Sequence, residues 1–406
     1  MNVSHIALLP WLLVAMAAAA CLGLLILVLG LQRVFAVAPR LDSTAGGEGE
    51  LLSASSLTVV IPAYNEARNI GDCVSHVLAS EPPCARWSLL VVDDDSSDAT
   101  PDLAVAAAEA CSLPPERFSF LQAGPRPQDQ RWVGKNWACC CAAEGTRSDW
   151  LLFIDADVRL QPGTLRRALR QAEADQADLL SLAPRLACSC LAEWMVQPIM
   201  ASLLGLGFPI QAANDPASEV AFAAGPFMLF RRSAYEQIGG HRSLAAEVVE
   251  DLALARRIKG GGYRLRYLLG LDALDLQMYA DLASLWEGWS KNWFLGLDSS
   301  VAKALAAAAV VVLMFSGPWL LAGSALVLLA LWPDASAWWL ALLLLSGLGV
   351  GLQLVLRLWT RREFAVPLQH WWLMGVGGLI VGGIGPTSVI RSLTGMGWTW
   401  KGRSLA

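Results

Sequence analysis

Charged residues are scarce in this chain of 406 residues: Asp, Glu, Lys and Arg make up 16%, whereas hydrophobic residues make up 55%. A water-soluble domain carries more charge than this, so part of the chain is expected to lie in lipid. The net charge of −5 argues against nucleic-acid binding, which requires a basic face. The nine cysteines form no CxxC pair and the four histidines no cluster, which argues against a zinc site. A G-x-G-x-x-G motif is also missing, so a Rossmann dinucleotide site is not supported.

A long apolar stretch lies near the start of the chain. Residues 6–31 contain no charge and, at about 1.5 Å per residue, can cross a bilayer of roughly 30 Å. A cleaved signal peptide is the alternative, because Ala36-Val37-Ala38 resembles a cleavage site. However, the run is roughly twice the usual length and no positive charge precedes it. Since Arg33 and Arg40 follow the stretch, the positive-inside tendency predicts that the next segment is cytoplasmic.

A second apolar region begins near residue 304. Residues 304–332 are expected to form one kinked span around Gly317-Pro318, and residues 337–356 another. Residues 364–390 are rich in glycine and contain Pro386, so the sequence does not decide whether they form a third span. Three full crossings would leave the basic residues of the C-terminus outside the cell, against the positive-inside tendency. Either the last segment re-enters the membrane on the same side or one boundary differs.

The region between the spans alternates short apolar runs with helical patterns. Residues 57–61, 88–92 and 150–154 are continuous apolar runs of strand length, as in parallel strands that are buried on both faces. Helical patterns lie between them at residues 67–79, 102–110 and 136–146. This alternation predicts a doubly wound α/β sheet whose ligands bind at the carboxyl ends of the strands.

Polar motifs follow these strands at the predicted ligand-binding edge. They are Pro62-Ala63-Tyr64-Asn65-Glu66, Asp93 to Asp98, and the pair Asp155 and Asp157. Each loop alone can be a turn that begins a helix. Together they supply what a nucleotide site needs: an aromatic face in Tyr64, a carboxylate for a base N–H in Asp94, and paired carboxylates for Mg²⁺ or Mn²⁺.

The order of five motifs resembles the membrane-attached, inverting family 2 glycosyltransferases with a GT-A fold. The motifs are PAYNE (62–66), VVDDDSSDAT (91–100), GKNWA (134–138), FIDADV (153–158) and VEDLALARRI (249–258). The resemblance covers residues 58–296 and implies that Tyr64 stacks on the base, Asp94 bonds to it, and Asp157 binds the metal together with Asp155. It implies that Asp251, beside Glu250, is the catalytic base. The donor nucleotide side would also include Pro62, Glu66, Asp93 and Lys135.

Finer motifs are similar to those of glycosyltransferases associated with carotenoid and hopanoid pathways. They are WVGKNW (132–137), GPFML (225–229), GGH (239–241), GWSKN (288–292) and the closing WKGR (400–403). Gly225, His241, Trp289 and Lys291 are the candidates for the acceptor or diphosphate side. The alternative for His241 is a structural role, and the alternative for Lys291 is contact with lipid headgroups. Asp95 stands where glycine is common, and the QxxRW motif of processive polysaccharide synthases is absent, which weakens any prediction of chain elongation.

A tryptophan-rich stripe precedes the C-terminal spans. Leu282, Leu285, Trp286, Trp289 and Trp293 recur at helical spacing, which is typical of a helix in the membrane interface. Residues 191–210 are a candidate for a second such helix. The alternative is that both are ordinary core helices packed against the sheet. An interfacial position would open the site at the level of the bilayer and would favour a lipid acceptor.

These observations predict a multi-pass protein of the inner membrane with a cytoplasmic catalytic domain. The predicted parts are an anchor (1–40), a linker (41–56), a GT-A domain (57–275), an interfacial helix (276–300) and a C-terminal transmembrane region (301–406). The predicted activity is transfer of a hexosyl group from a nucleotide-diphosphate sugar, UDP-linked, to a hydroxyl of a carotenoid or isoprenoid lipid. A polyprenyl-phosphate acceptor and a non-catalytic membrane scaffold are the alternatives. A phosphatase with Asp155 as nucleophile is disfavoured, because such enzymes usually have Thr or Val two positions after the second acid, where this chain has Arg159.

Overall fold

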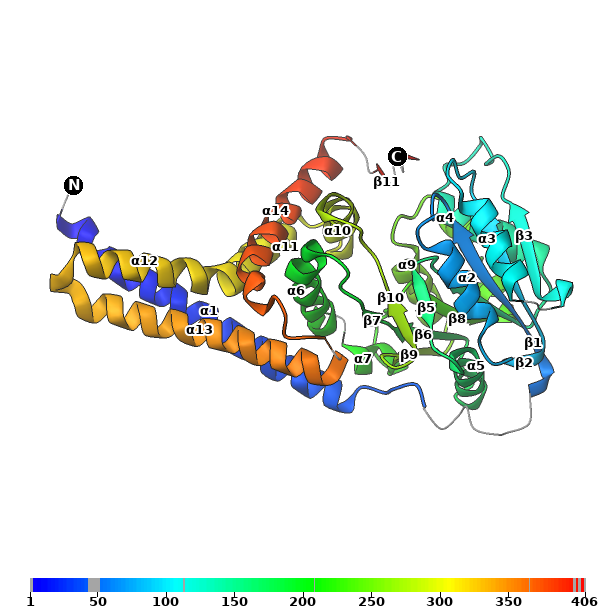
Figure 1. Ribbon diagram of the computed structural model, residues 1–406, viewed down its shortest axis with the longest axis horizontal. Coiled ribbons are helices and arrows are strands. Elements are labelled where there is room, and N and C mark those ends of the chain that lie inside the picture. Colours follow the sequence, from blue (N-terminus) through cyan, green and yellow to red (C-terminus); the bar gives the residue numbers. More distant parts are fainter. Residues whose placement is uncertain are drawn as a thin grey trace.

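The computed structural model describes residues 3–42, 52–111, 114–207, 209–364, 366–396, 399–400 and 403–404. Figure 1 shows an α/β domain at one end and a long helical bundle that extends away from it. Most of the predicted linker at residues 41–56 lies outside the described residues, and Leu52 already belongs to the first strand.

The α/β domain is built on a seven-stranded sheet in the order β3-β2-β1-β4-β8-β6-β9. Its strands are parallel except β8, which runs antiparallel to both β4 and β6. The predicted apolar runs form the three strands β1, β2 and β4. The bounds are β1 Leu52–Ala63, β2 Cys84–Asp93, β3 Phe118–Gln122, β4 Trp150–Ile154, β6 Leu179–Ala183, β8 Phe227–Arg231 and β9 Leu265–Leu269. A small sheet of β5 (Val158–Leu160), β10 (Leu274–Leu276) and β7 (Arg185–Leu186) adjoins it.

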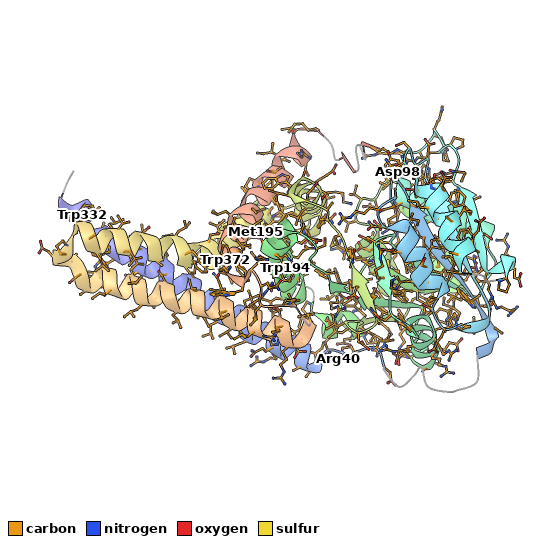
Figure 2. All side chains as sticks on the ribbon, in the orientation of Figure 1. Arg40, Asp98, Trp194, Met195, Trp332 and Trp372 are labelled. Atoms are coloured by element: carbon orange, nitrogen blue, oxygen red, sulfur yellow. The ribbon has the colours of Figure 1, made fainter. Side chains whose placement is uncertain are left out.

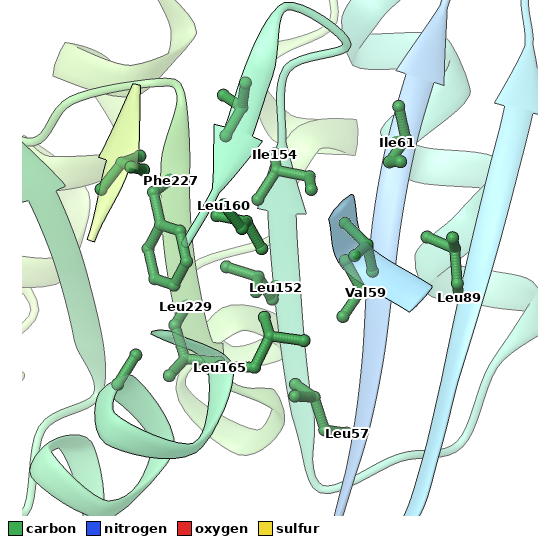
Figure 3. Packing of buried hydrophobic residues seen from close by; sticks show 14 of the residues in the cluster. Leu57, Val59, Ile61, Leu89, Leu152, Ile154, Leu160, Leu165, Phe227 and Leu229 are labelled. Atoms are coloured by element: carbon green, nitrogen blue, oxygen red, sulfur yellow. The ribbon is translucent and has the colours of Figure 1, made fainter. Parts of the chain in front are cut away.

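Helices cover both faces of the sheet, so the strands are apolar on both sides. Val59 and Ile61 pack with Leu152 on one face, as Figure 3 shows, whereas Val60 and Phe153 belong to the core on the other face. This burial explains the continuous apolar runs in the sequence. The helices of the domain are α2 Ile70–Leu78, α3 Thr100–Ala110, α4 Gly134–Gly145, α5 Thr164–Ala174, α7 Ile210–Asn214, α8 Arg232–Gln237 and α9 Glu250–Gly260. The described residues therefore confirm the predicted α/β fold.

Four helical segments of the described chain are long and apolar enough to cross a membrane: Leu8–Val37, Val301–Leu331, Pro333–Phe364 and Trp371–Leu393. The helices are α1 Val3–Val37, α11 Val301–Val311, α12 Gly317–Leu331, α13 Ser336–Phe364 and α14 Met374–Leu393. A π-helical turn, Val312–Ser316, joins α11 to α12. It lies directly before Pro318, which lacks the N–H needed to continue a regular helix. The kink predicted around Gly317-Pro318 is thus present.

Helices α1, α12 and α13 form the bundle that projects from the α/β domain, whereas α11 and α14 lie beside that domain with α6 (Leu191–Gly207) and α10 (Leu282–Gly296) (Figure 1). Figure 2 places Trp332, which follows α12, at the far tip of the bundle and Arg40 next to the domain. Glu363, at the end of α13, pairs with Arg40 at 2.8 Å. After α14, Arg403 bonds to Asp94 of the domain. Both ends of the last apolar segment are therefore connected to residues next to or in the α/β domain, in keeping with the re-entrant alternative.

Most of the tryptophan-rich stripe of α10 is buried inside the protein, although Leu282 at its start is 45% exposed. The exposed fractions of Leu285, Trp289 and Trp293 are 0%, 6% and 7%. Trp289 donates its Nε1–H to Gln197 of α6, and the backbone N–H of Phe294 donates to Ser388 of α14. These contacts favour the core-helix interpretation over an interfacial one, because the stripe faces α6 and α14. Periodicity alone cannot distinguish a helix that faces lipid from one that faces other helices.

We expect Gly377→Ala to destabilise the protein, because α14 approaches α6 closely at this glycine. A Cβ added there would lie 2.7 Å from the carbonyl carbon of Met195, and backbone atoms cannot yield as a flexible side chain can. Overpacking of this kind costs about 1–3 kcal/mol, so the midpoint of thermal unfolding in detergent should fall. Gly347→Ala is the matched control, since a Cβ there meets no atom within 4 Å. An equal midpoint for both variants would contradict the close packing of the two helices.

Candidate active site

One cavity of about 280 Å³ lies at the carboxyl ends of the strands. Three neighbouring parallel strands, β1, β2 and β4, deliver their following loops to this edge, as the sequence predicts. The predicted site residues that line the cavity are Pro62, Tyr64, Glu66, Asp94, Lys135, Asp155, Asp157, Gly225, Glu250, Asp251 and Lys291. The structure therefore brings together side chains from positions 62 to 291.

The loops after β1 and β2 hold each other in place. The hydroxyl of Ser96 accepts the backbone N–H of Asn65 at 2.9 Å, and Ser97 donates its backbone N–H to the Asn65 side chain at 2.8 Å. Asn65 and Asp95 have positive φ angles of 51° and 65°. Asp and Asn tolerate this left-handed conformation better than most residues, and glycine tolerates it best. This conformation explains why Asp95 can stand at a position where glycine is common.

Asp94 is buried and accepts hydrogen bonds from two arginines. Arg126 and Arg403 both donate to its Oδ2, Arg403 at 2.6 Å. Burial raises the pKa of Asp94, while the two guanidinium groups act in the opposite direction. The guanidinium of Arg403 also lies over the ring of Tyr64, 4.4 Å from its centroid. Tyr64 and Asp94, the predicted base-binding pair, are thus connected through Arg403.

Lys135, at the start of α4, bridges two carboxylates. Its Nζ lies 2.6 Å from Asp155 Oδ1 and 2.6 Å from Glu250 Oε1. Burial alone would raise the pKa of Glu250, but the ammonium of Lys135 outweighs it and lowers that pKa. Asn136 donates to the carbonyls of Leu244 at 2.7 Å and Glu247 at 2.9 Å. These bonds anchor the segment before α9 to α4, which explains why Lys and Asn adjoin in the GKNWA motif.

Asp251 lies in the first turn of α9 and faces the cavity. Its Oδ2 accepts the backbone N–H of Gly225 at 3.1 Å, and its Oδ1 accepts that of Leu252 at 2.7 Å. Burial and the neighbouring charge of Glu250 raise the pKa of Asp251 to about 6. A carboxylate with a pKa near the working pH is suited to general base catalysis, since it is ionised yet still basic.

Lys291 reaches the cavity from α10. Burial lowers its pKa, and the positive charge of Lys135 adds to this, while Glu250 opposes it. Lys135 and Lys291 thus line the same cavity as six carboxylates, those of Glu66, Asp94, Asp155, Asp157, Glu250 and Asp251. An anionic ligand such as a diphosphate would find cations on the side of Lys135 and Lys291.

The chemistry of the donor set fits a divalent cation that is shared with a ligand. Asp155 and Asp157 line the same cavity and offer hard oxygen donors. No group of three or more potential metal-ligating side chains occurs in the described parts of the chain. Mg²⁺ commonly binds through one or two carboxylates and completes its sphere with phosphate and water. The pair therefore suits a metal that arrives with a nucleotide, and does not suit a fully protein-bound structural site.

Three predicted site residues do not line the cavity. Asp93 is buried and accepts the backbone N–H of Ser96 at 3.0 Å, so it shapes the loop. His241 is buried against Phe153 and hydrogen-bonds to the hydroxyl of Tyr235 at 2.8 Å. Burial lowers the pKa of His241 to about 3, which keeps the ring neutral. Trp289 packs toward α6, as described above. These three side chains make contacts within the fold. For His241 this agrees with the structural alternative, whereas the donor-side role of Asp93 and the acceptor-side role of Trp289 stay predictions.

Arg126, Arg403 and Tyr279 were missed as site residues by the sequence analysis. Arg403 and Tyr279 line the cavity, and Arg126 bonds to Asp94. The closing WKGR motif was noticed but received no role, because nothing in its spacing indicates contact with a loop 309 positions away. Arg126 lies in a segment without periodic pattern. Only the tertiary structure brings these residues to the site.

The structure thus combines an α/β domain, whose acidic cavity lies at the carboxyl ends of the strands, with four described helical segments that are long and apolar enough to cross a membrane. Residues 58–239 match the family described as "Glycosyl transferase family 2", so the chain carries a glycosyl transferase family 2 domain. It is also similar to 4,4'-diaponeurosporenoate glycosyltransferases of Staphylococcus haemolyticus (strain JCSC1435), with 26% identity over 257 residues, and Staphylococcus aureus (strain MRSA252), with 25% over 255. Each alignment covers 62% of this chain and 64% of the relative, which is less than two thirds of either.

Two solved structures are also similar. The mannosyltransferase of Pyrobaculum calidifontis in complex with GDP-Man and Mn²⁺ has 16% identity and a TM-score of 0.48, covering 94% of this chain and 99% of the other. The glucosyl-3-phosphoglycerate synthase of Mycobacterium tuberculosis, in complex with Mn²⁺, UDP and glucosyl-3-phosphoglycerate, has 15% identity and a TM-score of 0.36, covering 58% and 76%.

Proposed function

We propose that this chain is a membrane-bound glycosyltransferase that moves a hexosyl group from a nucleotide-diphosphate sugar to a hydroxyl of a hydrophobic, isoprenoid-type acceptor, with inversion. The observation that carries the proposal is the position of Asp251. A partly buried carboxylate with a raised pKa lines the same cavity as Tyr64, Asp94 and the Asp155/Asp157 pair. An acceptor base and a donor site are therefore within one space.

The donor side follows from the first two loops. Tyr64 offers an aromatic face for the base, and Asp94 offers a carboxylate for a base N–H. Uracil presents one such N–H together with a flat ring, in keeping with a UDP-linked sugar. Asp155 and Asp157 would hold Mg²⁺ or Mn²⁺, which, when bound, neutralises the diphosphate as a Lewis acid. Lys135 and Lys291 would stabilise the negative charge that develops on the leaving diphosphate.

The acceptor side follows from Asp251. It would remove the proton from an acceptor hydroxyl while the oxygen attacks the anomeric carbon on the face opposite the diphosphate, which inverts the configuration. Gly225 positions this base through its backbone N–H, and a Cβ at Gly225 would lie 3.0 Å from Asp251 Oδ2. The absence of a side chain at Gly225 thus leaves space for the acceptor oxygen near the carboxylate.

The acceptor class is supported by the helices beside the cavity. Gly288, Lys291 and Asn292 of α10 line the cavity, and α10 packs against the apolar helix α14. A lipid that enters along these helices would reach Asp251 from the membrane. The named activity of the staphylococcal relatives concerns a carotenoid acid, so transfer to a carboxylate is the second candidate. A carboxylate acceptor needs no base, and the raised pKa of Asp251 favours the hydroxyl.

We further propose an inner-membrane topology with the α/β domain in the cytoplasm. In this topology α1, the kinked α11–α12 unit and α13 cross the membrane, while the last apolar segment, which contains α14, re-enters from the cytoplasmic side and both of its ends stay there. Arg391 and Arg403 would then lie in the cytoplasm, in agreement with the positive-inside tendency. A C-terminal tag should be digested by protease in inverted membrane vesicles and protected in spheroplasts; the reverse pattern would contradict this topology.

Lipid extracts provide the direct test of the proposed activity. Cells with the chain should contain an isoprenoid lipid that is heavier by one hexose or deoxyhexose, by mass spectrometry, than the lipid of cells without it. The product should resist both mild acid and mild alkali, as an alkyl glycoside does. Loss of the sugar in mild acid would indicate a polyprenyl-phosphate acceptor, and loss in mild alkali an ester of a carboxylate. Identical lipid profiles would contradict the proposal and support a scaffold role.

The pH dependence of transfer should report Asp251. Its pKa is raised to about 6, and only the ionised form accepts a proton. As pH falls below 6, kcat/KM should therefore decrease about tenfold per pH unit, and above pH 7 it should be constant. Initial rates at saturating metal between pH 5 and pH 8 check this prediction. A rate that stays constant down to pH 5 would indicate a base with an ordinary aspartate pKa, or none.

A further inference from the structure

The last described strand of the chain reaches the donor side of the cavity. Strand β12 (Arg403–Ser404) pairs with β11 (Thr399–Trp400), and both follow α14. Arg403 lines the cavity and is the final residue of the WKGR motif, for which the proposed function has no role. Its side chain is a planar cation that can both stack and donate hydrogen bonds.

Arg403 makes the two interactions that the proposed function assigns to the nucleotide base. Its guanidinium lies 4.4 Å from the centroid of the Tyr64 ring. Its Nη1 donates to Asp94 at two points, to Oδ2 at 2.6 Å and to the main-chain carbonyl at 2.9 Å. A bound uracil would make the same two contacts, because it is also a flat group that can stack on Tyr64 and donate an N–H to Asp94.

We propose that Arg403 occupies the base subsite in the nucleotide-free protein, so that the donor binds by displacing this side chain from Tyr64 and Asp94. The inference rests on the proposed function, because it takes Tyr64 and Asp94 as the base-binding pair. Stacked aromatic groups lie about 3.5–4 Å apart, the contact distance of two carbon atoms. A base needs about this separation on each of its two faces, so it cannot lie between the Tyr64 ring and a guanidinium carbon that is only 4.4 Å from the ring centroid.

Arg126 makes the displacement feasible. It donates to the same Oδ2 of Asp94, so the buried carboxylate keeps a charged partner when Arg403 leaves. Without Arg126, withdrawal of Arg403 would leave a buried charge unpaired, which is costly. The base N–H would then take the place of one guanidinium N–H. Arg403 thus lowers the affinity for the donor, because its stacking on Tyr64 and its hydrogen bonding to Asp94 must be broken before the base binds. It also covers the base subsite while no nucleotide is bound.

The test compares the affinity of the full-length protein in detergent for uridine and for UDP with Mn²⁺, by isothermal titration calorimetry. Uridine carries the base but no phosphate, so its binding does not include attraction between Arg403 and the diphosphate. Arg403→Ala should bind uridine about tenfold more tightly than the wild type, because it loses one partly desolvated cation–π contact and the two hydrogen bonds from Nη1 to Asp94. Arg403→Lys keeps the charge but loses the planar fork, so the gain should be smaller.

An unchanged or weaker affinity of Arg403→Ala for uridine, in a protein with the wild-type melting temperature, would overturn the inference. If Arg403→Ala does not fold, Arg403→Lys alone tests the inference, which then requires that this variant bind uridine more tightly than the wild type. A wild type that binds neither UDP nor GDP in the presence of Mn²⁺ would instead overturn the proposed function. Tight UDP binding by the wild type without a gain in either variant would leave the proposed function intact and reject only the role of Arg403.

Discussion

Asp251→Asn is expected to reduce kcat for sugar transfer by about 10²- to 10⁴-fold, the usual contribution of a general base. The amide has nearly the shape of the carboxylate, and it can still accept the backbone N–H of Gly225. It cannot accept a proton from the acceptor. The loss should therefore fall on kcat, while the affinity for UDP with Mn²⁺ changes little. Initial rates and calorimetry on the same preparation separate these two quantities.

Asp298→Asn is the matched control for this substitution. Asp298 is an exposed aspartate that pairs with Arg256 and Lys303 and does not line the cavity. Exposed ion pairs contribute little, so transfer should continue at the wild-type rate. Full activity in Asp251→Asn would remove its assignment as the base. It would also favour a carboxylate acceptor, which arrives already ionised.

Asp157→Ala is expected to abolish metal-dependent transfer. The substitution removes one of the two carboxylates of the cavity that we propose as metal ligands. With Asp155 already bound to Lys135 at 2.6 Å, the remaining site offers too few oxygen ligands for Mg²⁺ or Mn²⁺. The signal of bound Mn²⁺ in electron paramagnetic resonance, measured with UDP, should disappear together with activity.

The control for Asp157→Ala is Asp102→Ala, in the first turn of α3, where the aspartate is exposed. It should retain both the Mn²⁺ signal and transfer. Retention of the Mn²⁺ signal by Asp157→Ala would contradict the assigned metal site. Loss of the signal with full activity would show that the reaction does not depend on the metal.

Much of the catalytic domain could be predicted from the sequence because its signals are local. The buried strands β1, β2 and β4 are continuous apolar runs, and parallel strands place the loops that follow them at one edge. Tyr64, Asp94 and Asp157 were therefore predicted to lie together, and they line one cavity. The kink between α11 and α12 was likewise visible as Gly317-Pro318.

The remaining features depend on contacts between distant parts of the chain. The stripe of α10 has the same period whether it faces lipid or protein, and only α6 and α14 show that it is buried. His241 belongs to a motif of the subgroup, but its neutral ring packs against Phe153. Arg403 reaches Asp94 across more than 300 residues. No local pattern encodes such a contact, because it depends on where α14 ends.

Transfer of radiolabelled hexose from its UDP-linked donor into organic-extractable lipid, by the purified protein with Mn²⁺ and isoprenoid alcohol, tests the central claim most directly. The account predicts label in the lipid phase with the wild type, and loss of that label with Asp251→Asn or when the metal is chelated. Label that stays in the aqueous phase with the wild type, under conditions in which UDP binding is demonstrated, would contradict it.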